Sequence, residues 1–155
     1  MGNGGLAMGN SSVTGIFSLA TGYSSTASGK NSVATNASLA SGDSSFAANS
    51  GQATGARSFA TGEETEAIYA DSAVFGAFTK TSSAWQMVVG KGNEDDPNAL
   101  FIVGKGWKGS PSNAFKVLNN GNVWVSGEIT ANNIALTEKI AELEARLAAL
   151  EGGTN

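Results

Sequence analysis

The first half of the chain repeats a five-residue pattern of small and variable positions, Ser-x-Ala-x-Gly, in which Asn replaces Gly in some copies. Clear copies occupy residues 18–22, 25–29, 38–42 and 58–62. Copies recur every 6 or 7 residues, so two of them span 13 or 14. About five extended residues and one tight corner fill such a step, because Gly and Asn readily adopt the positive φ of a corner. The pattern therefore predicts a parallel β-solenoid over residues 1–78, with half a coil in each copy.

Alternation along these strands predicts which side chains face the interior. Successive residues of a strand point to opposite faces, so Ser, Ala and Gly share one face and the two x positions share the other. With the small face inward, each coil is a flat roll that buries little apolar area. The predicted interior residues are Ala20, Ala27, Ala34, Ala40, Ala47 and Ala60.

The x positions of every second copy form an apolar column along the roll. Its main members are Leu6, Leu19, Val33, Phe46, Phe59 and Phe75. The intervening copies carry mostly polar residues, with Leu39 and Ile68 as exceptions. Full burial of a Phe or Leu side chain contributes about 1.5–3 kcal/mol, so this column would be an aggregation-prone patch in water. We therefore predict that it packs at the axis of a homotrimer.

Residues 79–128 are predicted to continue the β-structure and to end in a neck or cap. The apolar segment 87–92 is echoed 14 residues later by 101–106, so the coil spacing persists. Alternating strands at 113–118 and 123–127 flank an Asn-Gly sequence, which indicates a β-hairpin. The aromatic residues expected to cover the open end of the solenoid are Trp107, Phe115 and Trp124.

From Ile129 onward the apolar spacing changes to three and four residues, which is typical of a coiled-coil seam. It predicts a parallel coiled coil over 129–151, followed by a flexible tail at 152–155. After Ile129 and Asn133, the predicted core residues are Leu136, Ile140, Leu143, Leu147 and Leu150. The alternative is a single amphipathic helix folded onto the domain.

Charged residues beside this seam favour parallel chains. Lys139 with Glu144 and Arg146 with Glu151 have the positions and opposite signs of pairs between neighbouring helices. Ile at position a with Leu at d favours dimers in isolated peptides. Because an isolated helix of this length is only marginally stable, we expect the solenoid to set the number of chains.

Composition excludes several function classes for this 155-residue chain. Cys and His are absent, which removes disulfides, thiolate nucleophiles, Cys/His metal sites and Ser-His-Asp triads. The formal net charge of −4 offers no basic surface for nucleic acid. No apolar run approaches the roughly 18–20 residues that cross a bilayer. We expect a protein that is neither an enzyme nor membrane-spanning and that uses no cofactor.

The Ser-x-Ala-x-Gly coils, the neck and the coiled coil together resemble the heads of trimeric autotransporter adhesins, over roughly residues 6–76. That resemblance implies a left-handed parallel β-roll in each of three chains, with small residues inside and the bulkier x column at the trimer axis. Residues 113–127 are more similar to segments of bacteriophage tail fibres, in which such heads also occur. The sequence carries no secretion signal or membrane-anchor barrel, so we expect a virion fibre first and a fragment of a bacterial adhesin as the alternative.

This assignment implies an extracellular or virion location. The implied partners are a bacterial surface glycan or protein receptor and other fibre or virion proteins. Which residues bind the receptor stays open.

The sequence supports three other functions less well than it supports the fibre. An ice-binding solenoid needs a flat, exposed row of threonines. The sequence gives a partial row of hydroxyl residues at Thr14, Ser28, Ser41 and Thr54. A glycosidase would use paired carboxylates, for which the candidates are Glu63, Glu64, Glu66 and residues 94–96. Calcium could bind the acidic loop 93–98, but its spacing matches neither an EF-hand nor a Gly-Gly-x-Gly-x-Asp repeat, so a solvated loop is favoured. We expect all of these acidic residues to be solvated surface groups.

Overall fold

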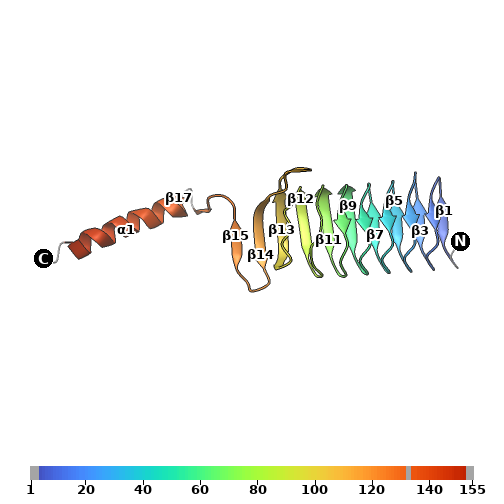
Figure 1. Ribbon diagram of the computed structural model, residues 1–155, viewed down its shortest axis with the longest axis horizontal. Coiled ribbons are helices and arrows are strands. Elements are labelled where there is room, and N and C mark those ends of the chain that lie inside the picture. The colour runs from blue at the N-terminus through green and yellow to red at the C-terminus, as the bar shows by residue number, and fades with distance from the viewer. Residues whose placement is uncertain (1–3, 132–133, 153–155) are drawn as a thin grey trace. The chain divides into compact units, whose positions relative to one another are not determined.

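The computed structural model describes residues 4–131 and 134–152. It confirms the prediction of a mainly β protein: a β-solenoid of about seven turns is followed by one C-terminal helix (Figure 1). The chain divides into two compact units, Met1–Trp124 and Val125–Asn155.

Two sheets form the solenoid, one from each half of the coils. The long sheet contains, in spatial order, β1 (Leu6–Met8), β3 (Leu19–Thr21), β5 (Val33–Thr35), β7 (Phe46–Ala48), β9 (Phe59–Glu63), β11 (Ala73–Ala77), β12 (Met87–Lys91), β13 (Ala99–Lys105), β14 (Asn113–Leu118) and β15 (Val123–Val125). The short sheet contains β2 (Ser12–Val13), β4 (Thr26–Ala27), β6 (Leu39–Ala40), β8 (Gln52–Ala53) and β10 (Glu66–Ala67). Paired strands are parallel in both sheets up to β13, with register steps of 13 or 14 residues.

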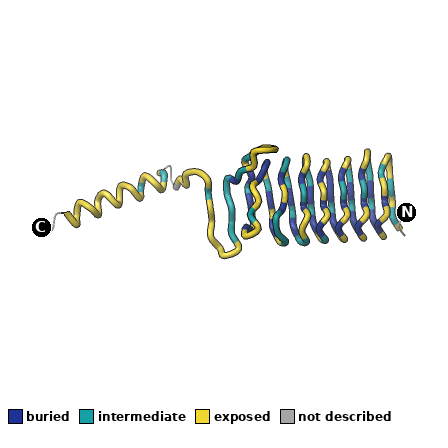
Figure 2. Tube along the Cα trace, viewed as in Figure 1, coloured by how far each residue is buried: buried dark blue, intermediate teal, exposed yellow. Residues whose placement is uncertain are grey.

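A column of small side chains fills the space between the sheets. The interior alanines are 0% exposed: Ala20, Ala27, Ala34, Ala40, Ala47, Ala53, Ala60 and Ala67. Larger side chains take over in the last coils, where Val74, Val88 and Ile102 belong to the same core. Figure 2 shows these buried positions recurring at each coil of the solenoid.

In several copies the Ser hydroxyl of the repeat donates a hydrogen bond to the backbone carbonyl at the preceding corner. Ser18 Oγ donates to the Gly15 carbonyl at 2.6 Å, Ser32 Oγ to that of Gly29 at 2.7 Å, and Ser58 Oγ to that of Gly55 at 2.6 Å. These serines are buried, and an unpaired carbonyl there would cost about 1–3 kcal/mol. The hydroxyl therefore explains the small polar residue two positions before the interior Ala in these three copies, whereas Ser38 Oγ donates to the Ala47 carbonyl instead, at 2.8 Å.

The two kinds of corner require Gly or Asn for different reasons. At Gly42 a Cβ atom would overlap the Gly55 carbonyl of the next coil, so close stacking excludes any side chain. At the opposite corner Asn36 and Asn49 both have φ of 53°, a region that Asn tolerates better than most residues. The Asn36 side chain also donates to Asn49 Oδ1 at 3.3 Å, which links successive coils.

The predicted hairpin is confirmed and ends the parallel stack. Strand β14 pairs antiparallel with β13, and β15 follows β14 in the sheet. In the connecting turn, the N–H of Gly121 donates to the Leu118 carbonyl at 3.0 Å, and Gly121 has φ of 86°. Leu118 packs against the core cluster, which Trp107, Phe115 and Trp124 do not join. The expectation that Phe115 covers the open end is wrong, because strand alternation places it opposite Val103, on the outer face of the sheet. A covering role for Trp107 and Trp124 stays a prediction.

Buried amide side chains replace the short sheet in the closing coils. Asn93 accepts the Lys80 N–H at 2.8 Å and donates to the Lys80 carbonyl at 3.0 Å. Asn113 makes the same two bonds with Glu94, at 3.0 and 2.9 Å. Gln86 donates to the Ala99 carbonyl at 2.7 Å. The amides satisfy backbone groups that a further strand would otherwise pair.

The second unit contains two short strands and a helix. Strands β16 (Thr130–Ala131) and β17 (Ile134–Ala135) pair antiparallel, and helix α1 spans Leu136–Gly152. The predicted helical start at Ile129 is therefore wrong, and Asn133 lies outside the described residues. The Glu128 carboxylate accepts hydrogen bonds from the Thr137 N–H at 3.2 Å and from the Thr137 hydroxyl. These bonds cap the helix about two turns after the start that its apolar spacing suggested.

Candidate functional site

An apolar stripe follows the outer face of the long sheet. Its first column is in continuous register: Leu6, Leu19, Val33, Phe46, Phe59, Ala73, Met87, Phe101 and Val117. The adjacent column begins with Met8, Thr21, Thr35, Ala48 and Thr61 and continues with Phe75, Val89, Val103 and Phe115. We call the apolar members of both columns the apolar stripe.

Aromatic rings stack along the middle of the apolar stripe. The rings of Phe46 and Phe59 lie 4.7 Å apart at 9°, and those of Phe59 and Phe75 lie 5.1 Å apart at 26°. Farther along, Phe101 meets Phe115 edge-on at 6.2 Å. These rings shield one another in part, but each remains partly exposed in the single chain.

The apolar stripe is longer than the column found by sequence reasoning. The six predicted members all lie on it, with Phe75 in the second column beside Phe59. Sequence reasoning missed its continuation through Met87, Val89, Phe101 and Val103. The 14-residue echo between 87–92 and 101–106 was the signal that could have extended it.

The outer face of the short sheet has a different character. Its register column holds Ser12, Thr26, Leu39, Gln52 and Glu66. The column mixes hydroxyl, apolar, amide and carboxylate groups. It offers neither a continuous apolar surface nor an uninterrupted rank of threonines.

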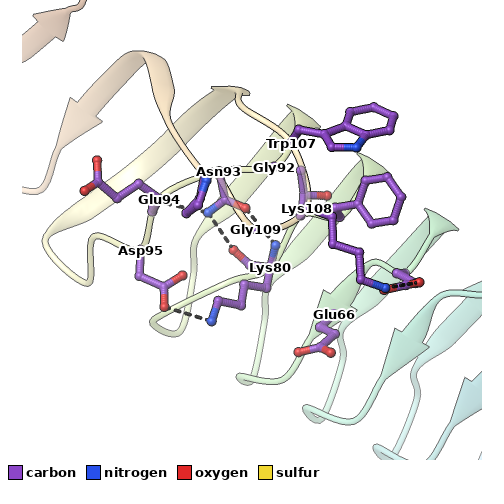
Figure 3. A pocket seen from close by; sticks show the side chains of 13 residues that line it. Glu66, Lys80, Gly92, Asn93, Glu94, Asp95, Trp107, Lys108 and Gly109 are labelled. Atoms are coloured by element: carbon purple, nitrogen blue, oxygen red, sulfur yellow. Dashed lines mark hydrogen bonds and ion pairs between the residues drawn. The ribbon is translucent and has the colours of Figure 1, made fainter.

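A groove of about 520 Å³ opens beside the closing coils, and we call it the neck groove (Figure 3). Its lining residues are Glu64, Glu66, Phe78, Thr79, Lys80, Gly92, Asn93, Glu94, Asp95, Trp107, Lys108, Gly109 and Pro111. One wall is the turn from Trp107 to Ser110, whose ends exchange backbone hydrogen bonds of 3.0 Å. Gly109 supplies the turn's positive φ of 83°.

Two ion pairs flank the neck groove. Lys80 Nζ lies 3.0 Å from Asp95 Oδ2, and Lys108 Nζ lies 2.6 Å from Glu64 Oε2. The hydrogen bond and charge of Asp95 raise the pKa of Lys80, and nearby Glu66 contributes in the same direction. All four paired side chains are about half exposed, so their remaining donors and acceptors face solvent.

An aromatic pair forms the rim of the neck groove. The rings of Phe78 and Trp107 meet edge-on at 5.0 Å. Lys91 Nζ lies 5.6 Å from the Trp107 ring centroid, and Lys108 Nζ lies at the same distance from that of Phe78. These contacts hold Trp107 in place although it is 56% exposed.

The structure brings together carboxylates that are distant in sequence. Glu64 and Glu66 line the neck groove with Glu94 and Asp95, whereas Glu63 does not line it. Glu94 points away from the ion pairs in Figure 3. Asp96 lies elsewhere, 2.6 Å from Lys116 Nζ, and this hydrogen bond lowers the pKa of Asp96. Among the described residues, no three acidic side chains are grouped closely enough to hold a metal ion.

Helix α1 presents the predicted seam residues to solvent. The exposed apolar residues of the helix are Leu136, Ile140, Leu143, Leu147 and Leu150. Within the chain, Glu142 Oε2 lies 2.6 Å from Lys139 Nζ, and Glu142 Oε1 lies 3.7 Å from Arg146 Nη1. The coiled coil and its pairs between chains stay predictions.

No protein-family model matches the chain, and no curated protein matches its sequence. In the part of the chain that the structure describes, no helix has the length and apolar character needed to span a membrane.

Proposed function

We propose that the chain is a segment of a homotrimeric adhesive fibre, in which the apolar stripes of three copies pack around a common axis. The observation that carries this proposal is the register of the apolar stripe along the long sheet from β1 to β14. A closed threefold arrangement covers the same surface on every copy.

The interior of the solenoid supports this proposal energetically. An alanine side chain contributes little apolar area, so the roll gains less from its own interior than a core of Leu and Phe would supply. Large apolar groups of these coils lie on the outer face of the long sheet, among them Leu6 at 54% exposure. Burying them against identical copies would move the main hydrophobic contribution to the interface.

Helix α1 supports the same assembly. Its apolar seam repeats at three and four residues, and none of its residues is buried in the single chain. A helix of 17 residues is marginal alone, whereas parallel chains in a trimer would bury the seam as a coiled coil.

The fibre is proposed to act by binding and not by catalysis. The resemblance of residues 113–127 to tail-fibre segments favours a bacteriophage virion over a bacterial adhesin. In that setting the stacked coils are a stiff spacer, and exposed groups contact a bacterial surface glycan or protein. Ice binding is less favoured, because the apolar Leu39 interrupts the polar column, and Gln52 and Glu66 stand where a rank of threonines would need hydroxyl groups.

Mass measurement by light scattering tests the assembly. We expect the particle in solution to have three times the mass of one chain. A version ending at Thr130 should also be trimeric if the apolar stripe sets the number of chains. A stable, folded monomer at micromolar concentration would contradict the proposal.

A pair of matched variants tests the surface itself. Phe46→Glu places charge on the apolar stripe and should dissociate the trimer, whereas Gln52→Glu adds the same charge to the short sheet and should leave it intact. Equal behaviour of the two variants would mean that the stripe is not the interface.

A further inference from the structure

We propose that the neck groove binds a neutral sugar ring of a surface glycan. This inference rests on the proposed function as an adhesive fibre, because it identifies where such a fibre would hold its receptor. The groove of about 520 Å³ is within the range of small-ligand sites and can take one or two rings.

The rim supplies an apolar surface for the ligand. Trp107 is anchored edge-on against Phe78 at 5.0 Å and remains 56% exposed. An indole ring combines apolar area with little conformational freedom, so binding to it costs little entropy. The C–H face of a sugar ring is the part of a polar ligand that packs on such a surface.

The charges of the neck groove favour a ligand without net charge. Lys80 and Lys108 present ammonium donors, and Glu64, Glu66 and Asp95 present carboxylate acceptors. A hydroxyl group can both accept from Lys80 and donate to Glu66. An acidic sugar or a phosphate would meet these three carboxylates and that of Glu94 at the edge of the groove, and an isolated cation would meet two ammonium groups.

Hydrogen bonds within the chain organise the backbone beneath these groups. Asn93 binds both the N–H and the carbonyl of Lys80, at 2.8 and 3.0 Å. Ion pairs of Lys108 with Glu64 and of Lys80 with Asp95 fix the side chains along the groove wall. A site that is already ordered loses little freedom on binding, and three copies in a fibre would add avidity to modest single-site affinity.

Binding of the full chain to immobilised oligosaccharides tests this site. The probes are neutral hexose, N-acetylhexosamine, amino-sugar and uronic-acid oligosaccharides on one array, followed by titration of any bound compound in solution. We expect binding to a neutral compound, a loss of at least tenfold in affinity with Trp107→Ala or Glu66→Gln, and no binding of uronic acids.

The matched control is Trp85→Ala, because Trp85 is also exposed, at 74%, but does not line the groove. It should bind as the unchanged protein does. The mass and circular dichroism of each variant separate loss of the site from loss of assembly or folding. The groove assignment is overturned if a folded trimer binds no neutral sugar, binds only charged sugars, or binds equally well after Trp107→Ala.

Discussion

The alanine coils, from β1 to β10, and the closing coils, from β11 to β14, share a 13- to 14-residue spacing as far as β13 but have different interiors. In the alanine coils, two parallel sheets enclose Ala side chains and buried serines. In the closing coils, one sheet encloses Val74, Val88 and Ile102, and the amides of Asn93 and Asn113 occupy the place of the second sheet.

The difference shows what ends a solenoid. Each alanine coil after the first is covered by a coil on either side, so a small side chain and a repeated hydrogen-bond ladder are sufficient. The last coil has no parallel successor, so bulkier side chains fill the interior and the antiparallel strand β14 completes the pairing. Reversing the strand direction also prevents another coil of the same kind from stacking on this edge.

The largest loss in the free energy of unfolding is expected from Gly42→Ala, which disrupts the close stacking of the alanine coils. The new Cβ would overlap the Gly55 carbonyl, so adjacent coils must separate, at a cost of about 3 kcal/mol or more. Chemical denaturation should show this loss, and hydrogen exchange should place it in β4 to β8. Gly127→Ala, which has open space around its Cβ, should change stability little.

A smaller loss is expected from Ile102→Ala in the closing coils. Ile102 is 0% exposed, and truncating a buried Ile leaves a cavity that costs about 2–5 kcal/mol. Leu100→Ala, at an exposed neighbouring position, is the control. Equal denaturation midpoints for the two variants would show that the larger interior side chains do not close the solenoid.

The smallest effect concerns pH and the pair of Asp96 with Lys116. Because the hydrogen bond from Lys116 lowers the folded pKa of Asp96, its contribution is present above the unfolded pKa and is lost as pH falls through the folded pKa. Asp96→Asn should therefore reduce the free energy of unfolding at pH 7, by about 1 kcal/mol or less. The difference between the variant and the unchanged protein should shrink below about pH 4. A difference that stays constant down to pH 2 would contradict this assignment.

Much of the fold was predictable because its local rules repeat. Alternation placed Ala20 and Ala47 inside and Phe46 and Phe59 outside, and all four lie there in the structure. The helical start was predicted too early, at Ile129. Apolar spacing alone does not reveal that the Glu128 carboxylate caps the helix at Thr137, nine residues farther along the chain.

The neck groove could not be predicted in the same way. Glu64 and Lys108 are far apart in the chain, and only the stacking of successive coils brings their side chains to 2.6 Å. The sequence had marked the carboxylates as separate surface groups, without the aromatic rim formed by Phe78 and Trp107.

The sequence by itself determined the coil length, the interior alanines and the existence of one apolar outer face, because these depend on residue size and a period of two along each strand. The tertiary structure decided how the solenoid ends and which distant side chains meet in the neck groove. Those outcomes depend on the register between coils and on single amide and carboxylate contacts, for which no repeated pattern exists in the chain.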